Sequence, residues 1–464
     1  MKMMLVLLTG TVLSLVAVQF AFHVLRTGAT RKGKTEATVA DIARSQGAEL
    51  ICDPHKHSLA EKALIHTSGN VLYCKLSDVK HSVGFDLLVP STHPDPEMRE
   101  LENHLEAENF VQMLMMAKDS ESLGALQLEW SYAALSLLLN NAHRFPPSIL
   151  PYAFMPDSRE FAALMRGAHT RDREKFETLR AYSPKALRAE VGSTYRLFKT
   201  VFGSPIFSAW SRGGFDLAKF YQNNGKAILE RGDECGDPTM RMLMGAITFQ
   251  TIKIGVKRKS PHPVIRIRAD EAVNAGLDFP HLVKATAETA KSGVFVEFLV
   301  QNHNFRNKKA DEILQNCLRH EWFCCPLYSL AREAAIDVLS GLRLQPGESR
   351  AEKLADLTDD IQNLDPGWRW VRDPSGSRRE YVPMLENPWP DWPGLRAAKL
   401  ENKLSKMYQR SEFIRQAPPS PGSPSETPDG NGRSTTPSPT TSSPEDGSAA
   451  ARLKRLRGKP PATS

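Results

Sequence analysis

The sequence predicts an α/β fold with a mainly parallel sheet, a helical insertion and a polar C-terminal tail. Three observations predict it. Residues 22–45 give a short strand, a glycine-containing loop and a helix, in that order. Apolar runs between residues 48 and 90 alternate with a helical stretch, which is typical of a parallel sheet. Residues 96–205 then carry apolar side chains near helical spacing.

The loop after the first strand matches a phosphate-binding pattern. Its sequence, GATRKGKT, fits G-x-x-x-x-G-K-[ST], and the flanking strand and helix argue against an accidental match in a basic loop. Glycines let backbone N–H groups curl around phosphates. Lys34 is expected to reach the β- and γ-phosphates of ATP, and the Thr35 hydroxyl to bind Mg²⁺. The predicted nucleotide-binding residues are Gly28, Ala29, Thr30, Arg31, Lys32, Gly33, Lys34 and Thr35.

Length, charge and cysteine usage set wide limits. A chain of 464 residues is long enough for two or three domains. The net charge of +7 weakly favours an anionic partner, such as nucleic acid or an acidic membrane face. The six cysteines are scattered and form no disulfide framework, and an ATP-binding chain is expected in a reducing compartment.

Residues 3–22 are uncharged and mostly apolar, and this run is long enough to cross a bilayer as a helix. The basic residues that follow, from Arg26 to Lys34, favour an inner-membrane anchor with the ATPase domain in the cytoplasm. A secretory signal peptide would deliver an ATP-binding loop to a compartment without ATP. The alternative is a cytoplasmic protein in which part of this run is a buried strand, because the first strand begins where the span ends.

The segments that follow continue the alternation of strands and helices. Residues 48–55 form an apolar strand that ends in Asp53-Pro54, followed by a helix at 59–66 and a strand at 70–76. The run at 83–90 closes this first block. Ligands of such sheets bind at the carboxyl ends of the strands.

Three segments in this order resemble a known group of ATPases. GATRKGKT, ICDPHKHSLAEKAL and VGFDLLVP are similar to the HerA/FtsK group of P-loop ATPases, particularly its type IV secretion coupling proteins and conjugative DNA-transfer ATPases. The resemblance covers roughly residues 22–345. It implies a RecA-like P-loop NTPase core, usually hexameric, that pumps DNA and works with secretion or conjugation machinery.

The resemblance also implies an all-helical domain inserted into the core, and a separate helical domain without a DNA role is the alternative. The tail is rich in Pro, Ser, Thr and Gly, so we expect disorder there. The predicted domains are a membrane anchor at 1–21, an ATPase core at 22–95 and 214–350, the helical insertion at 96–213, a C-terminal segment packing on the core at 351–414, and the disordered tail at 415–464.

Residues 263–272 are predicted to be the second ATPase motif, Walker B. Asp270 would hold Mg²⁺ through water, and Glu271 would polarise the attacking water. Arg266 and Arg268 stand where the resembling ATPases have apolar residues, and two charges on one face of a central strand are costly to bury without partners. They leave open a subunit boundary or impaired catalysis.

The strand at 293–302 ends near Gln301, which by resemblance occupies a sensor position for the γ-phosphate or the attacking water. A plain amide at a strand end is the alternative. Lys34, Glu271 and Gln301 are therefore the predicted catalytic residues. The resembling ATPases carry an Arg-Lys pair before this strand, but here the pair is Ala290-Lys291, which leaves a trans-acting arginine unassigned.

Two further clusters have plain explanations. Residues 317–325 hold three cysteines and one histidine at no standard zinc spacing, so packed thiols are expected. Trp368 and Trp370, with two later tryptophans, lie among arginines. Such a stretch could stack on bases, but we expect it to anchor the C-terminal segment on the core.

The sequence therefore predicts a P-loop ATPase that uses ATP and Mg²⁺ to move DNA. We expect a membrane-attached hexameric ring that serves conjugation or type IV secretion. Two alternatives remain open: a nucleotide-dependent assembly or binding switch, and a soluble DNA-processing or packaging ATPase.

Overall fold

A computed structural model describes most of the chain between residues 22 and 385. The described residues are 22–29, 32–55, 59–118, 123–232, 235–272, 274, 275, 277, 289–301, 316–383 and 385. The anchor predicted at 1–21 and the tail predicted at 415–464 lie outside them, as do Thr30 and Arg31 of the phosphate-binding loop. Among the helices of the described ranges, none combines the length and the apolar character that a bilayer crossing requires.

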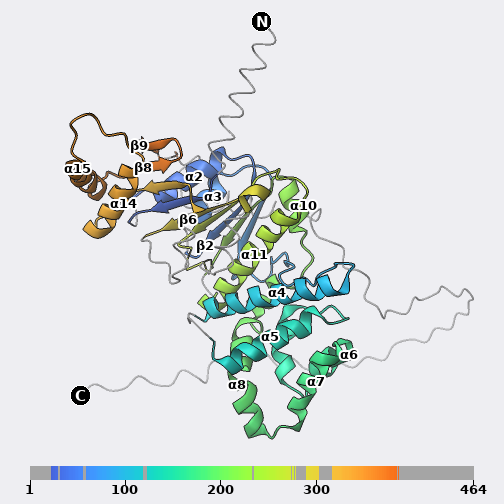
Figure 1. The fold of residues 1–464 in the computed structure, drawn as a ribbon. Helices are drawn as coiled ribbons and strands as arrows, with labels where there is room; N and C mark the ends of the chain where they lie inside the picture. The colour runs from blue at the N-terminus through green and yellow to red at the C-terminus, as the bar shows by residue number, and fades with distance from the viewer. Residues whose placement is uncertain are drawn as a thin grey trace, which may run out of the picture. The chain divides into compact units, whose positions relative to one another are not determined.

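A nine-stranded sheet runs through the described chain (Figure 1) in the order β3-β4-β2-β5-β6-β1-β7-β8-β9. Neighbours from β3 to β7 are parallel, and β7-β8 and β8-β9 are antiparallel. The strands are β1 (Val24–Thr27), β2 (Ala48–Asp53), β3 (Val71–Lys75), β4 (Lys226–Glu230), β5 (Ile265–Asp270), β6 (Val294–Val300), β7 (Arg319–Trp322), β8 (Trp368–Asp373) and β9 (Gly376–Tyr381). The predicted α/β fold with a parallel-rich sheet is confirmed.

Helices cover both faces of the sheet, so its central strands are buried on both sides. The covering helices are α2 (Lys34–Arg44), α3 (Leu59–His66) and α11 (Asp237–Lys257). Successive side chains of β2 point to opposite faces of the sheet. Ile51 joins the apolar cluster of α2 and α3. Its neighbour Cys52 points the other way, where its Sγ lies 3.7 Å from Oγ1 of Thr248 on α11.

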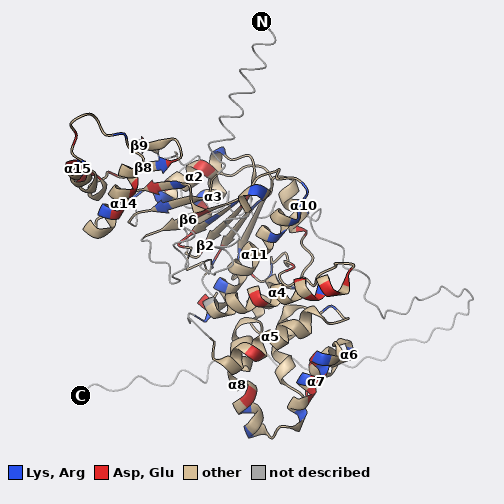
Figure 2. Ribbon diagram, viewed as in Figure 1, with Lys and Arg blue, Asp and Glu red and all other residues tan. Residues whose placement is uncertain are grey.

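A group of helices lies between β3 and β4 in the chain. They are α4 (Pro96–Ala117), α5 (Ala125–Leu139), α6 (Arg159–Gly167), α7 (Thr170–Glu177), α8 (Pro184–Val201), α9 (Pro205–Trp210) and α10 (Leu217–Gln222). These helices carry both signs of charge (Figure 2), which is typical of a solvated face. Gln250 and Lys253 of α11 donate to the Glu106 carboxylate of α4 at 2.8 and 2.7 Å, and these contacts fix α4 against α11.

The C-terminal part of the described chain extends the sheet instead of only packing on it. The sequence patterns did not predict β7, β8 or β9. These strands carry many charged residues, as in Trp368–Asp373, and a charged pattern is not typical of a strand inside a sheet. In the folded sheet, charges on neighbouring strands pair with one another. Helices α14 (Tyr328–Ser340) and α15 (Arg350–Gln362) cover these strands, and Trp370 donates to Asp360 of α15 at 2.6 Å.

Candidate nucleotide-binding site

The phosphate-binding loop leaves the carboxyl end of β1 between two neighbouring strands. The Gly28 N–H donates to the Val300 carbonyl of β6 at 3.3 Å, and the Ala29 N–H donates to the Cys324 carbonyl after β7 at 2.9 Å. A Cβ on Gly28 would lie 2.6 Å from Cβ of Phe323, closer than real Cβ atoms come. The strand ends on both sides therefore hold the loop where only glycine fits.

The far end of the loop turns directly into α2. Gly33 precedes the helix with φ 101°, in the left-handed region that favours glycine. Lys34 is the first helical residue, and its buried ammonium donates to the carbonyls of Gly28 and, at 3.0 Å, Ala29. Burial lowers the pKa of Lys34, while the carboxylate of Asp270 acts in the opposite direction. The ammonium thus lies across the curl of the loop.

Asp270 ends β5 at the same edge of the sheet and is buried. Burial, and next the nearby Asp53, raise the pKa of Asp270 to about 6. Asp53 itself ends β2, where its carboxylate accepts the N–H groups of His55 at 3.0 Å and Ala60 at 2.7 Å. Asp53 therefore shapes the β2 turn, and Asp270 is the carboxylate that lies nearer the phosphate-binding loop.

Glu271 is held by three side chains. Its φ of 41° is uncommon for a residue other than glycine. The His55 Nε2 lies 2.9 Å from one carboxylate oxygen of Glu271, and the amides of Asn274 and Gln301 donate to the same carboxylate. The hydrogen bond with His55 is the largest cause that lowers the pKa of Glu271 to about 2, and the same bond raises the pKa of His55. Glu271 is therefore an ionised carboxylate in a fixed position.

The structure brings most of the predicted site residues to one edge. Strands β1, β5 and β6 are neighbours in the parallel sheet, so Lys34, Asp270, Glu271 and Gln301 converge where those strands end. Thr35 is half-buried in the first turn of α2, and Lys32 is half-buried in the loop. Thr30 and Arg31 are outside the described residues.

The sequence motifs did not single out His55. Its signal was available, because His55 directly follows Asp53-Pro54 at the end of a strand, at the edge where ligands of a parallel sheet bind. Only the strand order shows that β2 lies beside β5, which places His55 next to Glu271.

The site fits a nucleotide with Mg²⁺. Mg²⁺ prefers oxygen ligands and keeps several waters and phosphate oxygens, so one or two protein oxygens suffice. The Thr35 hydroxyl and the Asp270 carboxylate are the candidate ligands. Over the described ranges, no group of three or more His, Cys, Asp and Glu side chains is arranged to hold a metal by itself. The cysteines at 317, 324 and 325 are buried and free.

The two arginines of β5 differ in their surroundings. Arg268 is buried, and it pairs with Glu297 of β6 and, at 3.3 Å, with Glu49 of β2. Arg266 is half-buried near the amino end of the strand. The buried charge of Arg268 is therefore compensated by carboxylates on both neighbouring strands.

Comparison with known proteins identifies the fold. No family model matches the chain, and no curated protein matches it. Among solved structures it is similar to the bacterial conjugative coupling protein TrwBdeltaN70 in an unbound form, with a TM-score of 0.52 and 14% identity over 79% of this chain and 86% of that chain.

Two nucleotide complexes of TrwB give similar values. TrwB with ADP and Mg²⁺ has a TM-score of 0.53 and 13% identity, and TrwB with the GTP analogue GDPNP has 0.52 and 15%. Each match covers 79% of this chain and 87% of TrwB. The chain therefore shares the fold of the conjugative coupling protein TrwB, which is the fold that its motifs predicted.

Proposed function

We propose that this chain is an ATPase that couples ATP hydrolysis to DNA movement, in conjugation or type IV secretion. The observation that carries the proposal is the convergence of Lys34, Asp270, Glu271 and Gln301 beside the phosphate-binding loop. TrwB, which shares the fold, is described in complex with ADP and Mg²⁺ and with a non-hydrolysable ATP analogue. Both facts support ATP and Mg²⁺ as the ligands of this site.

Each residue has a proposed task. Lys34 leaves the loop carbonyls to contact the β- and γ-phosphates, and the loop N–H groups surround them. Thr35 and Asp270 hold Mg²⁺, which offsets phosphate charge when bound. Glu271 orients the attacking water, and Gln301, already bonded to Glu271, links that carboxylate to the γ-phosphate position.

We further propose that subunits assemble into a ring, expected to be a hexamer, attached to the inner membrane through residues 3–22. In such a ring, turnover at each site would move loops that contact the DNA backbone. The net charge of +7 is compatible with a polyanionic substrate.

A second candidate is a nucleotide-dependent assembly switch with slow turnover. The specific observation in its favour is that the Glu271 carboxylate is bonded to His55, Asn274 and Gln301. These bonds must be released before Glu271 can orient water. A switch would bind ATP without DNA-dependent hydrolysis.

The test is ATP hydrolysis by the full chain in detergent, with and without single- and double-stranded DNA. Lys34→Ala removes the phosphate contact and Glu271→Gln removes the carboxylate, while Glu129→Gln on the helical layer is the matched control. The motor requires DNA-stimulated hydrolysis that both site variants abolish and the control retains. ATP binding with slow hydrolysis that ignores DNA would establish the switch instead.

A further inference from the structure

A large cavity lies where α11 meets the helices that stand between β3 and β4 in the chain. Its volume is about 770 Å³, within the range of about 300–1,000 Å³ that small-molecule sites occupy. Helices α4, α10 and α11, which lie close together in Figure 1, line it with three connecting segments, at residues 85–92, 144–147 and 211–213. Ile265, the first residue of β5, also lines it, whereas Asp270 ends that strand at the nucleotide site. The cavity is therefore distinct from the nucleotide site.

Most of the residues that line the cavity are apolar. Leu88, Val89 and Ile254 are half-buried, so part of each aliphatic side chain remains accessible in the wall. Phe145, which is also half-buried, adds an aromatic ring. Small-molecule pockets are lined mainly by such side chains, with a small number of polar groups that orient the ligand. The wall therefore suits an apolar chain.

One buried hydroxyl in the wall lacks a hydrogen bond. Ser211 lines the cavity and is 3% exposed, and within the part of the chain that the structure describes its Oγ has no hydrogen-bond partner. A buried hydroxyl without a partner is costly, and native structures leave few of them. An acceptor atom of a bound ligand would remove that cost.

Basic side chains accompany this hydroxyl. Arg212 directly follows Ser211, is exposed, and donates to the Ser82 carbonyl at 2.8 Å. Because that acceptor is neutral, the contact orients the guanidinium without neutralising its charge. The basic lining residues are Arg144, Arg212, Lys253, Lys257 and Arg258, and the acidic ones are Asp86 and Glu102. Glu106 pairs with Lys253 from outside the lining, and basic residues still outnumber acidic ones when it is counted. The lining therefore favours an anionic head group over a cationic one.

We propose that this cavity binds a carboxylate with an apolar chain, of the size of a medium-chain fatty acid. The chain lies against Leu88, Val89 and Ile254, and the carboxylate accepts hydrogen bonds from Ser211 and Arg212. Arginine suits this task because its planar fork matches the two oxygens of a carboxylate. This binding site is additional to the proposed ATPase activity and does not depend on it.

The experiment measures the thermal midpoint of the full chain in detergent as octanoate is added, because a ligand that binds the folded state raises the midpoint. Octanol keeps the chain without the charge, and acetate keeps the charge without the chain; both are added in parallel, with ionic strength matched by sodium chloride. Arg212→Gln removes the charged contact, Ser211→Ala removes the hydroxyl, and Ala218→Phe fills the cavity from α10. Arg188→Gln, at an exposed position of α8, is the control.

The proposal expects octanoate to raise the midpoint more than octanol or acetate does. Half-saturation should need about tenfold more octanoate in Arg212→Gln, because a hydrogen bond to a charged group is lost, and Arg188→Gln should match the native chain. Ser211→Ala gives the same test if Arg212→Gln does not fold, and Ala218→Phe should abolish the rise. No rise with octanoate, an equal rise with octanol or acetate, or a rise that the head-group variants and Ala218→Phe all retain would overturn the proposal.

Discussion

The surroundings of Glu271 constrain both its backbone and its side chain. Its backbone adopts a left-handed conformation, and His55 holds its carboxylate at 2.9 Å. Non-glycine residues in this conformation persist where the surroundings over-determine them, and such positions cluster at functional sites. The contact with His55 therefore fixes the direction in which Glu271 points.

We expect His55→Ala to lower kcat for ATP hydrolysis by up to about 100-fold, because a misplaced catalytic group costs that much. KM should change little, since His55 is not among the residues proposed to hold the nucleotide. Steady-state kinetics checks this, with His81→Ala as the control, because His81 is an exposed histidine that also pairs with a carboxylate, that of Asp78. A higher kcat in His55→Ala would mean that His55 restrains Glu271, as the switch requires.

Gly28 allows a sharp test of the loop. In Gly28→Ala the new methyl group would meet Phe323 Cβ at 2.6 Å, so the loop must move and ADP should bind about tenfold more weakly or worse. Calorimetric titration with ADP and Mg²⁺ measures the change. Gly192→Ala is the matched control, since its nearest atom is Arg188 Cβ at 3.9 Å and helical Gly→Ala stabilises by about 1 kcal/mol. Unchanged ADP affinity in Gly28→Ala would show that the loop adjusts freely.

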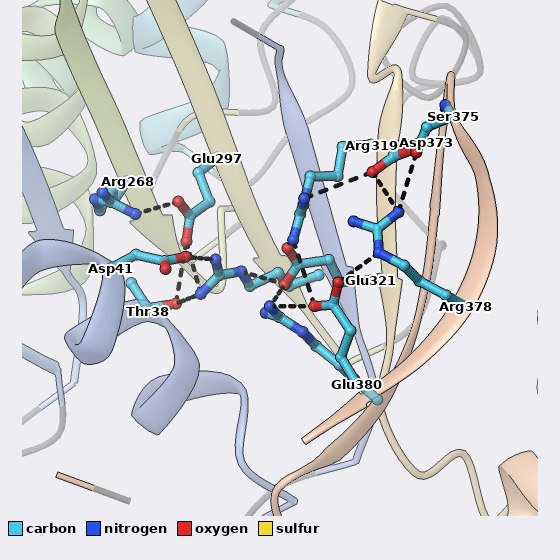
Figure 3. Close-up of polar contacts among 12 residues, drawn as sticks. Thr38, Asp41, Arg268, Glu297, Arg319, Glu321, Asp373, Ser375, Arg378 and Glu380 are labelled. Atoms are coloured by element: carbon cyan, nitrogen blue, oxygen red, sulfur yellow. Dashed lines mark hydrogen bonds and ion pairs between the residues drawn. The ribbon is translucent and has the colours of Figure 1, made fainter. Parts of the chain in front are cut away.

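At the scale of elements, ion pairs between charged side chains (Figure 3) link neighbouring strands in addition to apolar packing. Arg268 joins β5 to β2 and β6, and Glu321 joins β7 to Arg26 of β1 and Arg369 of β8. Such buried networks add stability only while each member keeps its partners. Removing the Glu321 carboxylate takes one partner from each of three buried or mostly buried guanidinium groups, those of Arg26, Arg319 and Arg369.

We therefore expect Glu321→Gln to lower the free energy of unfolding by about 3–5 kcal/mol. The matched control, Glu129→Gln, removes an exposed carboxylate that pairs with Lys175 and should cost about 1 kcal/mol or less. Urea unfolding of both variants measures the two values. Equal small losses would mean that water or a shift of the strands replaces the missing charge.

At the scale of the whole molecule, the same network makes stability depend on pH. Burial alone would raise the pKa of the Glu321 carboxyl, but Arg26, Arg369 and Arg319 hold it well below its ordinary value. Burial and Arg26 act in the same opposing ways on Asp41, whose pKa is also lowered. A carboxyl with a lowered folded-state pKa adds stability above its unfolded-state pKa, and that stability is lost as pH falls through the folded value.

The free energy of unfolding should therefore decrease as pH falls from about 5 towards 3, where the unfolded carboxyls take up protons first. Urea unfolding at a series of pH values gives the slope, and Glu321→Gln should show a shallower slope than the native chain. A slope that Glu321→Gln leaves unchanged would place the pH dependence in other carboxyls.

The sequence by itself determined the local parts of this protein. The phosphate-binding loop, the helix at 59–66 and the strands ending at Asp53 and Asp270 follow from patterns of a few residues, because turn chemistry and periodicity act over short distances. The motif order also predicted the fold that the TrwB structures share. The functional roles of Lys34, Glu271 and Gln301 remain predictions.

Only the tertiary structure decided which distant residues meet. The strand order places β2 beside β5 and so brings His55 to Glu271. It also gives Arg268 partners from two strands that lie far away in sequence, and it pairs the charged residues that hid β8 and β9. The free energy of burying a charge depends on its neighbours, and only the folded sheet supplies them. The sequence alone therefore could not show that these charges are compensated.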